Sequence, residues 1–540
     1  MFKTMGTIYR QDDVISYSVA FQKQTSDPLC SSKNLAVTNL SKPVRKKLLI
    51  SCFLLNFVVS FVMYHGFLNQ HFSIDSFDIL QSQNHQMASW HINNGRFVYS
   101  AVVYLLDVLN IDIVLNAFLW SLLFMRASAF CCVMLLNYLL EFQDFSLLPL
   151  MVLDLGALAT YNNVFVAEWY QFVECVPMYI ITILSATAAA IQITKQQHDG
   201  KRFRIFFAFA LLAISYNTYQ IGLPLFFFLV LALTVFHSNL IVTLKDCLRL
   251  LIVVLICIAV VLMNLVLTQA CLPFIASESS RYDSLSIRNV FENIYLLIKE
   301  QPNLWLRANG MIGGPWMLLF VISLAVLAGY TVYTRKMKAV HALLLLILLI
   351  GGCSCVFVPV LLGSDFWMPP RTIAFLFAFT FFFSCIIAKS THKIILIGQL
   401  ISTSVFLLVS TFYVGIYSGD TLLSNKFDKQ YIQELNAQIE LYEQETNCDI
   451  QYLAFLPDAS MEWRWDVAGQ YKWDVCNRVI STAWSRLNAI NYYTGKGYLA
   501  CEDSLIPNDI KDYALAHDWN EYIPSEQLFF SDDTCYICLF

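Results

Sequence analysis

The sequence has 540 residues, of which 58% are hydrophobic and only 14% are charged, and its mean hydropathy is +0.58. A soluble globular chain carries about a quarter of its residues as charged side chains, so this composition excludes a soluble protein. The formal net charge of -5 is spread along the chain and does not indicate nucleic acid as a partner.

The chain starts with a polar stretch over residues 1–47 that has no hydrophobic signal region, which predicts a cytoplasmic tail. A membrane-spanning helix needs about 20 apolar residues. We expect eleven spans, at 48–68, 111–140, 146–166, 174–194, 203–218, 220–237, 249–270, 314–334, 339–361, 372–388 and 394–416. The run 203–237 is divided because residues 216–220 are polar, and a single long tilted helix is the alternative.

Lysine and arginine collect beside five of these spans, in the segments 42–47, 195–204, 245–249, 335–338 and 389–393. Short cytoplasmic loops are enriched in these residues. With eleven spans all five clusters fall on one side of the membrane. The pattern therefore predicts a polytopic α-helical membrane protein with a transmembrane domain at 48–416, a cytoplasmic N-terminus and an extracytoplasmic segment at 417–540.

The first external loop offers a pair of carboxylates, Asp75 and Asp78, directly after the first span. A carboxylate among Phe72, Phe77 and Trp90 is partly desolvated and is suited to act as a general base. The alternative is structural, because the same spacing of three residues fits the capping of a short helix.

Further external residues suit a site for an anionic substrate. Glu168 lies at the mouth of a span, either as a site residue or facing water beside anchoring aromatics. Arg281 and Arg371 precede spans on the outer side, against the usual distribution of positive charge. Guanidinium binds phosphate with two parallel hydrogen bonds, so a phosphate is the expected partner, with contact to lipid headgroups as the alternative.

The segments HFSIDSFDIL, NNGRFVYS and YNTYQIGLPLFFFL, together with the C-terminal YIPSEQLFFSDDTCYICLF, carry a resemblance to a family. They resemble the bacterial serotype-converting glucosyltransferases of the Gtr type II family, which are similar in architecture to the GT-C glycosyltransferases. The resemblance places the family's acidic residue on Asp75, with Asp78 as the close alternative. It places the GR motif on Gly95 and Arg96, and the YQ motif on Tyr219 and Gln220.

The resemblance implies transfer of a hexosyl group, usually glucose, from a polyprenyl-phosphate carrier to a surface polysaccharide or lipid-linked glycan. The expected location is the outer face of the bacterial cytoplasmic membrane. Arg96, Arg281 or Arg371 would meet the charge on the departing phosphate. No cofactor is expected and no metal site is indicated, although a divalent ion is compatible with the chemistry. Phe-rich segments at 205–236 and 374–383 either line a groove for the prenyl chain or pack against other helices.

Two other functions share these features. A flippase or transporter for lipid-linked sugars would place its acidic residues near the middle of the membrane. A polymerase or ligase of lipid-linked oligosaccharides would use similar substrates. The external position expected for Asp75 and Glu168 favours an enzyme.

The composition changes after residue 418, where residues 428–445 predict a soluble amphipathic helix. A strand is expected at 452–456, and the final segment LFFSDDTCYICLF is expected to form either a closing strand or a hairpin with Asp532 and Asp533 at its turn. This predicts a small α/β domain, for which we expect a role in acceptor selection. Its five cysteines, an odd number, allow at most two disulfides: Cys448, Cys476, Cys501, Cys535 and Cys538.

Overall fold

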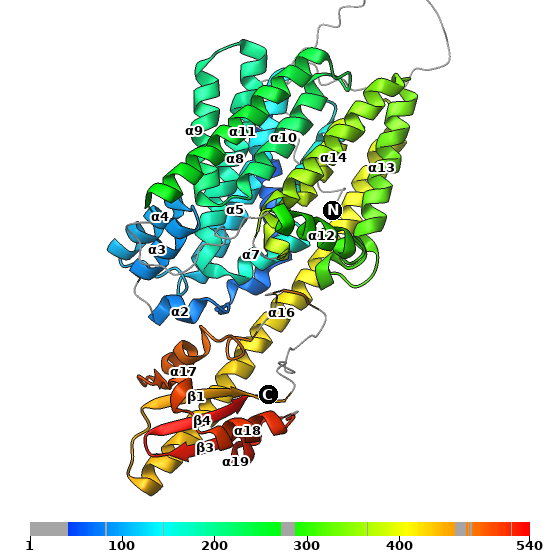
Figure 1. Cartoon of the computed structure of the whole chain (residues 1–540). Coiled ribbons are helices and arrows are strands. Elements are labelled where there is room, and N and C mark those ends of the chain that lie inside the picture. Colours follow the sequence, from blue (N-terminus) through cyan, green and yellow to red (C-terminus); the bar gives the residue numbers. More distant parts are fainter. Residues whose placement is uncertain are drawn as a thin grey trace, which may run out of the picture. The chain divides into compact units, whose positions relative to one another are not determined.

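The computed structural model describes residues 42–539 except 82–83, 144, 272–286, 364–365, 460–470, 474, 476–477 and 520 (Figure 1). The described part is mostly helical. The long apolar helices are α1 (Lys42–Tyr64), α5 (Ala117–Phe142), α6 (Leu147–Tyr161), α8 (Val176–Asp199), α9 (Phe203–Thr218), α10 (Gly222–His237), α11 (Leu244–Cys271), α13 (Trp316–Thr334), α14 (Ala339–Leu361), α15 (Ala378–Ile387) and α16 (Lys393–Thr446). The shorter or amphipathic helices between them are α2 (Ser76–Gln81), α3 (Asn84–Asn93), α4 (Phe97–Val108), α7 (Ala167–Gln171) and α12 (Ile287–Arg307).

Eight helical segments in the described residues are long and apolar enough to cross a membrane. Three further expected spans coincide with the shorter apolar helices α9, α10 and Ala374–Ile387. The chain is therefore a polytopic membrane protein, and the count of eleven spans stays a prediction. The run 203–237 forms two helices, because α9 ends at Thr218 and α10 begins at Gly222.

The segment after the last expected span differs from expectation. Instead of a span followed by a separate amphipathic helix, α16 is one helix of 54 residues. No proline interrupts it, so nothing removes a backbone hydrogen bond between its apolar and its polar half. At 1.5 Å per residue it is about 80 Å long, more than twice the hydrocarbon thickness of a bilayer.

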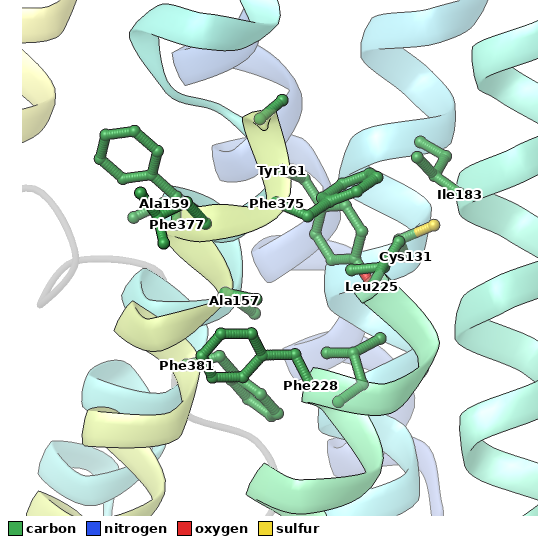
Figure 2. Packing of buried hydrophobic residues seen from close by; sticks show 14 of the residues in the cluster. Cys131, Ala157, Ala159, Tyr161, Ile183, Leu225, Phe228, Phe375, Phe377 and Phe381 are labelled. Atoms are coloured by element: carbon green, nitrogen blue, oxygen red, sulfur yellow. The ribbon is translucent and has the colours of Figure 1, made fainter. Parts of the chain in front are cut away.

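The apolar core of the bundle is built from α5, α6, α8, α10 and the segment 374–387 (Figure 2). Phe228 of α10 and Phe381 of α15 are fully buried in it, with small residues such as Ala157 of α6 beside them. Every residue of α15 is buried inside the protein. The Phe-rich segment 374–383 is therefore a packing surface and not a wall open to a lipid chain.

Side-chain contacts bring the five basic clusters to one end of the bundle. Arg45 donates to the Asn137 carbonyl at 2.6 Å, and Glu141, one turn further along α5, forms an ion pair of 2.6 Å with Lys195. Three more bonds join the remaining clusters, Arg249 to the Gln197 carbonyl, Arg335 to the Lys389 carbonyl and Lys389 to Gln143. Their meeting at one end agrees with the expectation that all five lie on the same side of the membrane.

The residues after α16 form a four-stranded sheet in the order β2-β1-β4-β3. Its strands are β1 (Tyr452–Pro457), β2 (Leu499–Ala500), β3 (Leu528–Ser531) and β4 (Thr534–Leu539), and its helices are α17 (Arg486–Thr494), α18 (Asn508–Ala516) and α19 (Pro524–Gln527). Strand β1 pairs in parallel with β2 and β4, while β3 and β4 form the expected hairpin, with Asp532 at φ 49° in its turn. The four cysteines described here are free thiols, namely Cys448, Cys501, Cys535 and Cys538.

Candidate active site

A short loop and helix α2, which follow α1, carry the two candidate carboxylates Asp75 and Asp78. The hydroxyls of Ser73 and Ser76 donate to the two oxygens of Glu174, at 2.6 and 3.1 Å. Glu174 is 1% exposed, so this contact fixes the loop to the start of α8 from inside the protein. Asp75 and Asp78 consequently have a defined position, Asp75 just before α2 and Asp78 within its first turn.

Both carboxylates also contact the segment that begins α17. The indole N–H of Trp484 donates to Oδ1 of Asp75 at 3.0 Å, and the Asn488 amide donates to Oδ1 of Asp78 at 3.1 Å. Burial raises the pKa of Asp78 above its usual value, and the bond from Asn488 partly opposes that shift. The two carboxylates are thus differently placed, although they are only three residues apart.

The GR and YQ motifs meet, although more than 120 residues separate them in the sequence. Gln220 donates through its amide to the carbonyl of Asn94 at 2.6 Å, directly before the GR motif. The guanidinium carbon of Arg96 lies 4.9 Å from the ring centre of Tyr219, and 5.2 Å from that of Trp90. The two motifs therefore form one structural unit.

The backbone conformation of Gly95, which lies between Asn94 and Arg96, makes the contact between the two motifs geometrically feasible. Its φ of +69° lies in the left-handed region, which glycine adopts without a steric penalty. The amide of Asn264 donates to the Gly95 carbonyl at 2.6 Å and to Asn217 at 2.9 Å. A side chain at position 95 would lie 2.7 Å from the Asn264 oxygen, so α11 approaches the backbone there too closely for any other residue.

Arg96 is held by aromatic rings and not by a carboxylate. Among the described residues no acidic side chain forms an ion pair with it, and its Nε is buried without a hydrogen-bond partner there. His91, which is 1% exposed, lies near it with two ring nitrogens that also have no partner within the described part of the chain. Burial, and secondly the Arg96 charge, hold the pKa of His91 well below its usual range, so its ring is neutral.

A row of aromatic rings connects this unit to Arg371. Tyr219 contacts Tyr179 edge-on with the ring centres 5.6 Å apart, and Tyr179 stacks on Trp169 at 4.3 Å. The Trp169 indole then donates to the Arg371 carbonyl at 2.8 Å. The candidate residues of the loop, of α7, of the end of α9 and of η7 (Pro370–Thr372) thus belong to one contiguous region.

Glu168 and Arg371 form a buried ion pair inside this region. One oxygen of Glu168 accepts from the Arg371 guanidinium and the other from the Arg371 backbone N–H at 2.6 Å. Glu168 is fully buried, and the guanidinium also lies over the rings of Phe172 and Trp367, at 4.1 and 4.7 Å. This pairing favours a structural role for Glu168 over proton transfer, because both carboxylate oxygens are bonded to one partner.

Cys175 lies within the influence of several charged groups. The charges of Glu174, Arg96, Asp75 and Arg371 all act on its thiol, so two acids and two arginines lie in its neighbourhood. Asp78 is absent from that set. In the portions that the structure describes, no cluster of histidine, cysteine, aspartate and glutamate has the geometry of a metal site.

The structure therefore brings together Asp75, Arg96, Tyr219, Gln220, Glu168 and Arg371, whereas Asp78 bonds to Asn488 and is not part of this group, and Arg281 lies outside the described residues. Sequence reasoning missed Trp484, Asn488, His91 and Asn264. None of the four belongs to a motif. A polar side chain within an apolar span, such as Asn264, was the one available signal, because such residues are costly in lipid unless they are bonded.

The candidate acids and arginines thus lie together in a helical protein with eight segments long and apolar enough to cross a membrane, counted over the described residues. The family model described as Glucosyl transferase GtrII matches residues 64–388, which is more than half of the chain and includes both motifs. The chain belongs to this family, and it is a membrane glycosyltransferase. Comparison with curated proteins and with solved structures finds no match.

Proposed function

We propose that the protein transfers a glucosyl group from a polyprenyl-phosphate donor to a surface polysaccharide or lipid-linked glycan on the outer face of the membrane. The observation that carries this proposal is the junction of the two motifs, where Arg96 is placed by Tyr219 and Gln220 without an acidic partner in the described residues. A guanidinium in this state has its charge and its hydrogen bonds available for a phosphate.

Asp75 is the proposed general base. The acceptor hydroxyl oxygen attacks the anomeric carbon, its proton passes to the Asp75 carboxylate, and the bond from that carbon to the phosphate oxygen breaks. The electron pair remains on the lipid phosphate, and Arg96 stabilises the negative charge that develops there. Inversion at the anomeric carbon follows from this single displacement.

Electrostatic surroundings support Asp75 over the other acids. Its charge acts on Glu174 and Cys175, and the charge of Arg96 acts on Cys175 as well, which supports Asp75 as the acid that shares a site with Arg96. Glu174 binds two serine hydroxyls, and Glu168 is bonded to Arg371. We therefore assign positioning roles to Glu168 and Asp78.

Orientation is the second part of the proposal. The basic clusters meet at one end of the bundle, and the positive-inside rule makes that end cytoplasmic. Residues 1–47 would then form a cytoplasmic tail, residues 48–416 the transmembrane transferase domain and residues 417–540 an extracytoplasmic domain. Donor and acceptor would meet at the outer surface of a bacterial cytoplasmic membrane.

The test is transfer of radiolabelled glucose from polyprenyl phosphate to purified bacterial surface polysaccharide, in membranes that contain equal amounts of each variant. Asp75→Asn should lower the rate by about 10²–10⁴-fold, as expected for loss of a general base. Arg96→Gln should lower kcat by about 10²–10³-fold, as for loss of one charge-stabilising donor. Full activity of Asp75→Asn would show that another residue is the general base. Absence of transfer by the wild type would refute the proposed donor or acceptor.

A further inference from the structure

Trp484 combines two properties that its position in a loop does not explain. Its indole N–H is bonded to Asp75 at 3.0 Å, and yet 58% of the side chain is exposed. Tryptophan is normally among the more deeply buried residues, so an exposed ring next to a functional carboxylate is unusual. The bond fixes the orientation of the ring and leaves much of its surface open to solvent.

The first helix turn after it continues the same surface. Asn488 lies one turn beyond Trp484 and binds Asp78, and Tyr492, a further turn along, is 39% exposed. Tyr492 packs edge-on against Phe77 of α2, with the ring centres 5.3 Å apart. Helix α17 therefore packs against α2, and together with Trp484 just before it presents a row of one amide and two aromatic side chains beside the two carboxylates.

Such a row matches the surface of a sugar. A pyranose ring carries C–H groups on one side, which pack well against the electron-rich face of an aromatic ring, and hydroxyls at its edge, which pair with amides and carboxylates. A carboxylate has about four acceptor positions, so the bond from Trp484 leaves Asp75 able to accept a proton.

We propose that Trp484, with Asn488 beside it, forms the acceptor-sugar subsite, in which the acceptor ring stacks on the indole and directs one hydroxyl to Asp75. This proposal rests on the proposed transferase function and adds the location of the acceptor. It assigns to the segment around α17 the role of holding a saccharide, while the lipid-linked donor occupies the side of Arg96.

Three variants distinguish binding of the acceptor sugar by Trp484 from a role in which Trp484 only positions Asp75. Trp484→Phe keeps an aromatic surface and loses the N–H, whereas Trp484→Leu loses both. Trp316→Leu, at another exposed tryptophan, serves as the matched control because it is 42% exposed and lies on α13, away from α17. Initial rates are measured against the concentration of the surface polysaccharide at saturating donor, and hydrolysis of the donor is measured without acceptor.

Stacking predicts that Trp484→Leu raises the acceptor KM by about tenfold, as expected for truncation of an aromatic binding residue. Trp484→Phe should stay within about threefold of the wild-type acceptor KM on the same scale. The donor KM should be unchanged in both, whereas donor hydrolysis should fall by a similar factor in both, because each variant loses the N–H bond to Asp75. An equal loss of kcat in both variants with unchanged acceptor KM would overturn the proposal, because Trp484 would then act only through its bond to Asp75.

A measurement on the unmodified protein covers the case in which Trp484→Leu fails to fold. Tryptophan oxidation by N-bromosuccinimide, mapped by mass spectrometry, should be slowed at Trp484 by the polysaccharide and not by the donor. Equal oxidation with and without saturating polysaccharide would refute the subsite, even if transfer itself is confirmed. Absence of transfer by the wild type would instead refute the proposed function.

Discussion

Asn425 of α16 clamps the backbone of Phe72 at two points. Its side-chain oxygen accepts from the Phe72 N–H at 2.7 Å, and its amide donates to the Phe72 carbonyl at 2.9 Å. Phe72 lies three residues before Asp75 and next to Ser73, which is bonded to Glu174. The loop that carries Asp75 is thus fixed from two sides, by the long helix α16 and by the start of α8.

Removing this clamp should affect the reaction more than donor binding. Asn425→Leu leaves the Phe72 N–H and C=O without their partner, which costs about 1–3 kcal/mol where the groups are buried. We expect kcat for glucosyl transfer to fall about tenfold or more while the donor KM stays unchanged, because a general base must lie within hydrogen-bond reach of its proton.

The control for this prediction lies on the same helix. Among the described residues, the Asn436 side chain bonds only to Glu440 of α16 itself, at 2.8 Å, so Asn436→Leu changes an amide to an apolar side chain without touching the loop. Equal kcat for Asn425→Leu and the wild type would show that Glu174 alone holds the loop.

Local sequence patterns were sufficient for the helices and the final hairpin. Long apolar runs predicted the spans because lipid offers no partner to an open backbone, and polar residues near Tyr219 predicted the break between α9 and α10. The turn at Asp532 followed from a polar pair between two apolar strands. The continuity of α16 was not predicted, because the change of composition after residue 418 looks like a boundary even where the helix continues.

The sequence predicted individual site residues but not the contacts between them. Glu168 and Arg371 are 203 residues apart, and nothing local to either one signals the other. Their pairing depends on how α7 packs against the segment before α15, which is a property of the whole bundle. In the sequence, Arg96 is a candidate through the GR motif and Arg371 through its position before a span, and the pairing of Arg371 with Glu168 distinguishes them further in the structure.

The ion pair of Glu168 and Arg371 should be strongly coupled in stability. Glu168→Gln removes the charge opposite the buried guanidinium, and Arg371→Met removes the guanidinium but keeps the backbone N–H bond to Glu168, so each should cost up to about 3–5 kcal/mol, the range for a broken buried pair. The double variant should lose clearly less than the sum of both. Thermal unfolding of the purified protein in detergent measures the three losses.

The exposed pair of Lys195 and Glu141 provides the comparison, because its side chains are 23% and 34% exposed. Its coupling should remain below about 1 kcal/mol, the usual range for exposed pairs. If the two pairs show the same coupling, Glu168 does not have the structural role assigned to it.

Gly95 should not tolerate a side chain. Gly95→Ala combines a positive φ with a contact of 2.7 Å to Asn264, so we expect a lower melting temperature and reduced transfer through displacement of Arg96. Gly200→Ala is the matched control, since its φ is +67° and nothing lies within 4 Å of the added carbon. A loss in Gly95→Ala no greater than that in Gly200→Ala would show that the close approach of α11 is unimportant.

The pH dependence of Asn488→Ala separates the two carboxylates. Burial raises the pKa of Asp78 from its usual value of 3.8, and the Asn488 amide opposes this by stabilising the charged form. Removing the amide therefore raises the pKa of Asp78 further. A base must be deprotonated to act, so the acid limb of the pH–rate profile would move to higher pH if Asp78 were the base. With Asp75 as the base, we expect the acid limb to keep its position.

The melting temperature of Asn488→Ala provides a second test of its bond to Asp78. A carboxyl whose pKa is raised on folding binds its proton more tightly in the folded state, so its contribution to stability falls as pH rises from the unfolded to the folded pKa. Asn488→Ala enlarges this difference, and its melting temperature should lie further below that of the wild type at pH 7 than at pH 4. In a background of Asp78→Asn the titrating group is absent. The difference in melting temperature that Asn488→Ala causes should then no longer depend on pH. A gap that persists unchanged in the double variant would show that Asn488 stabilises α17 by contacts other than its bond to Asp78.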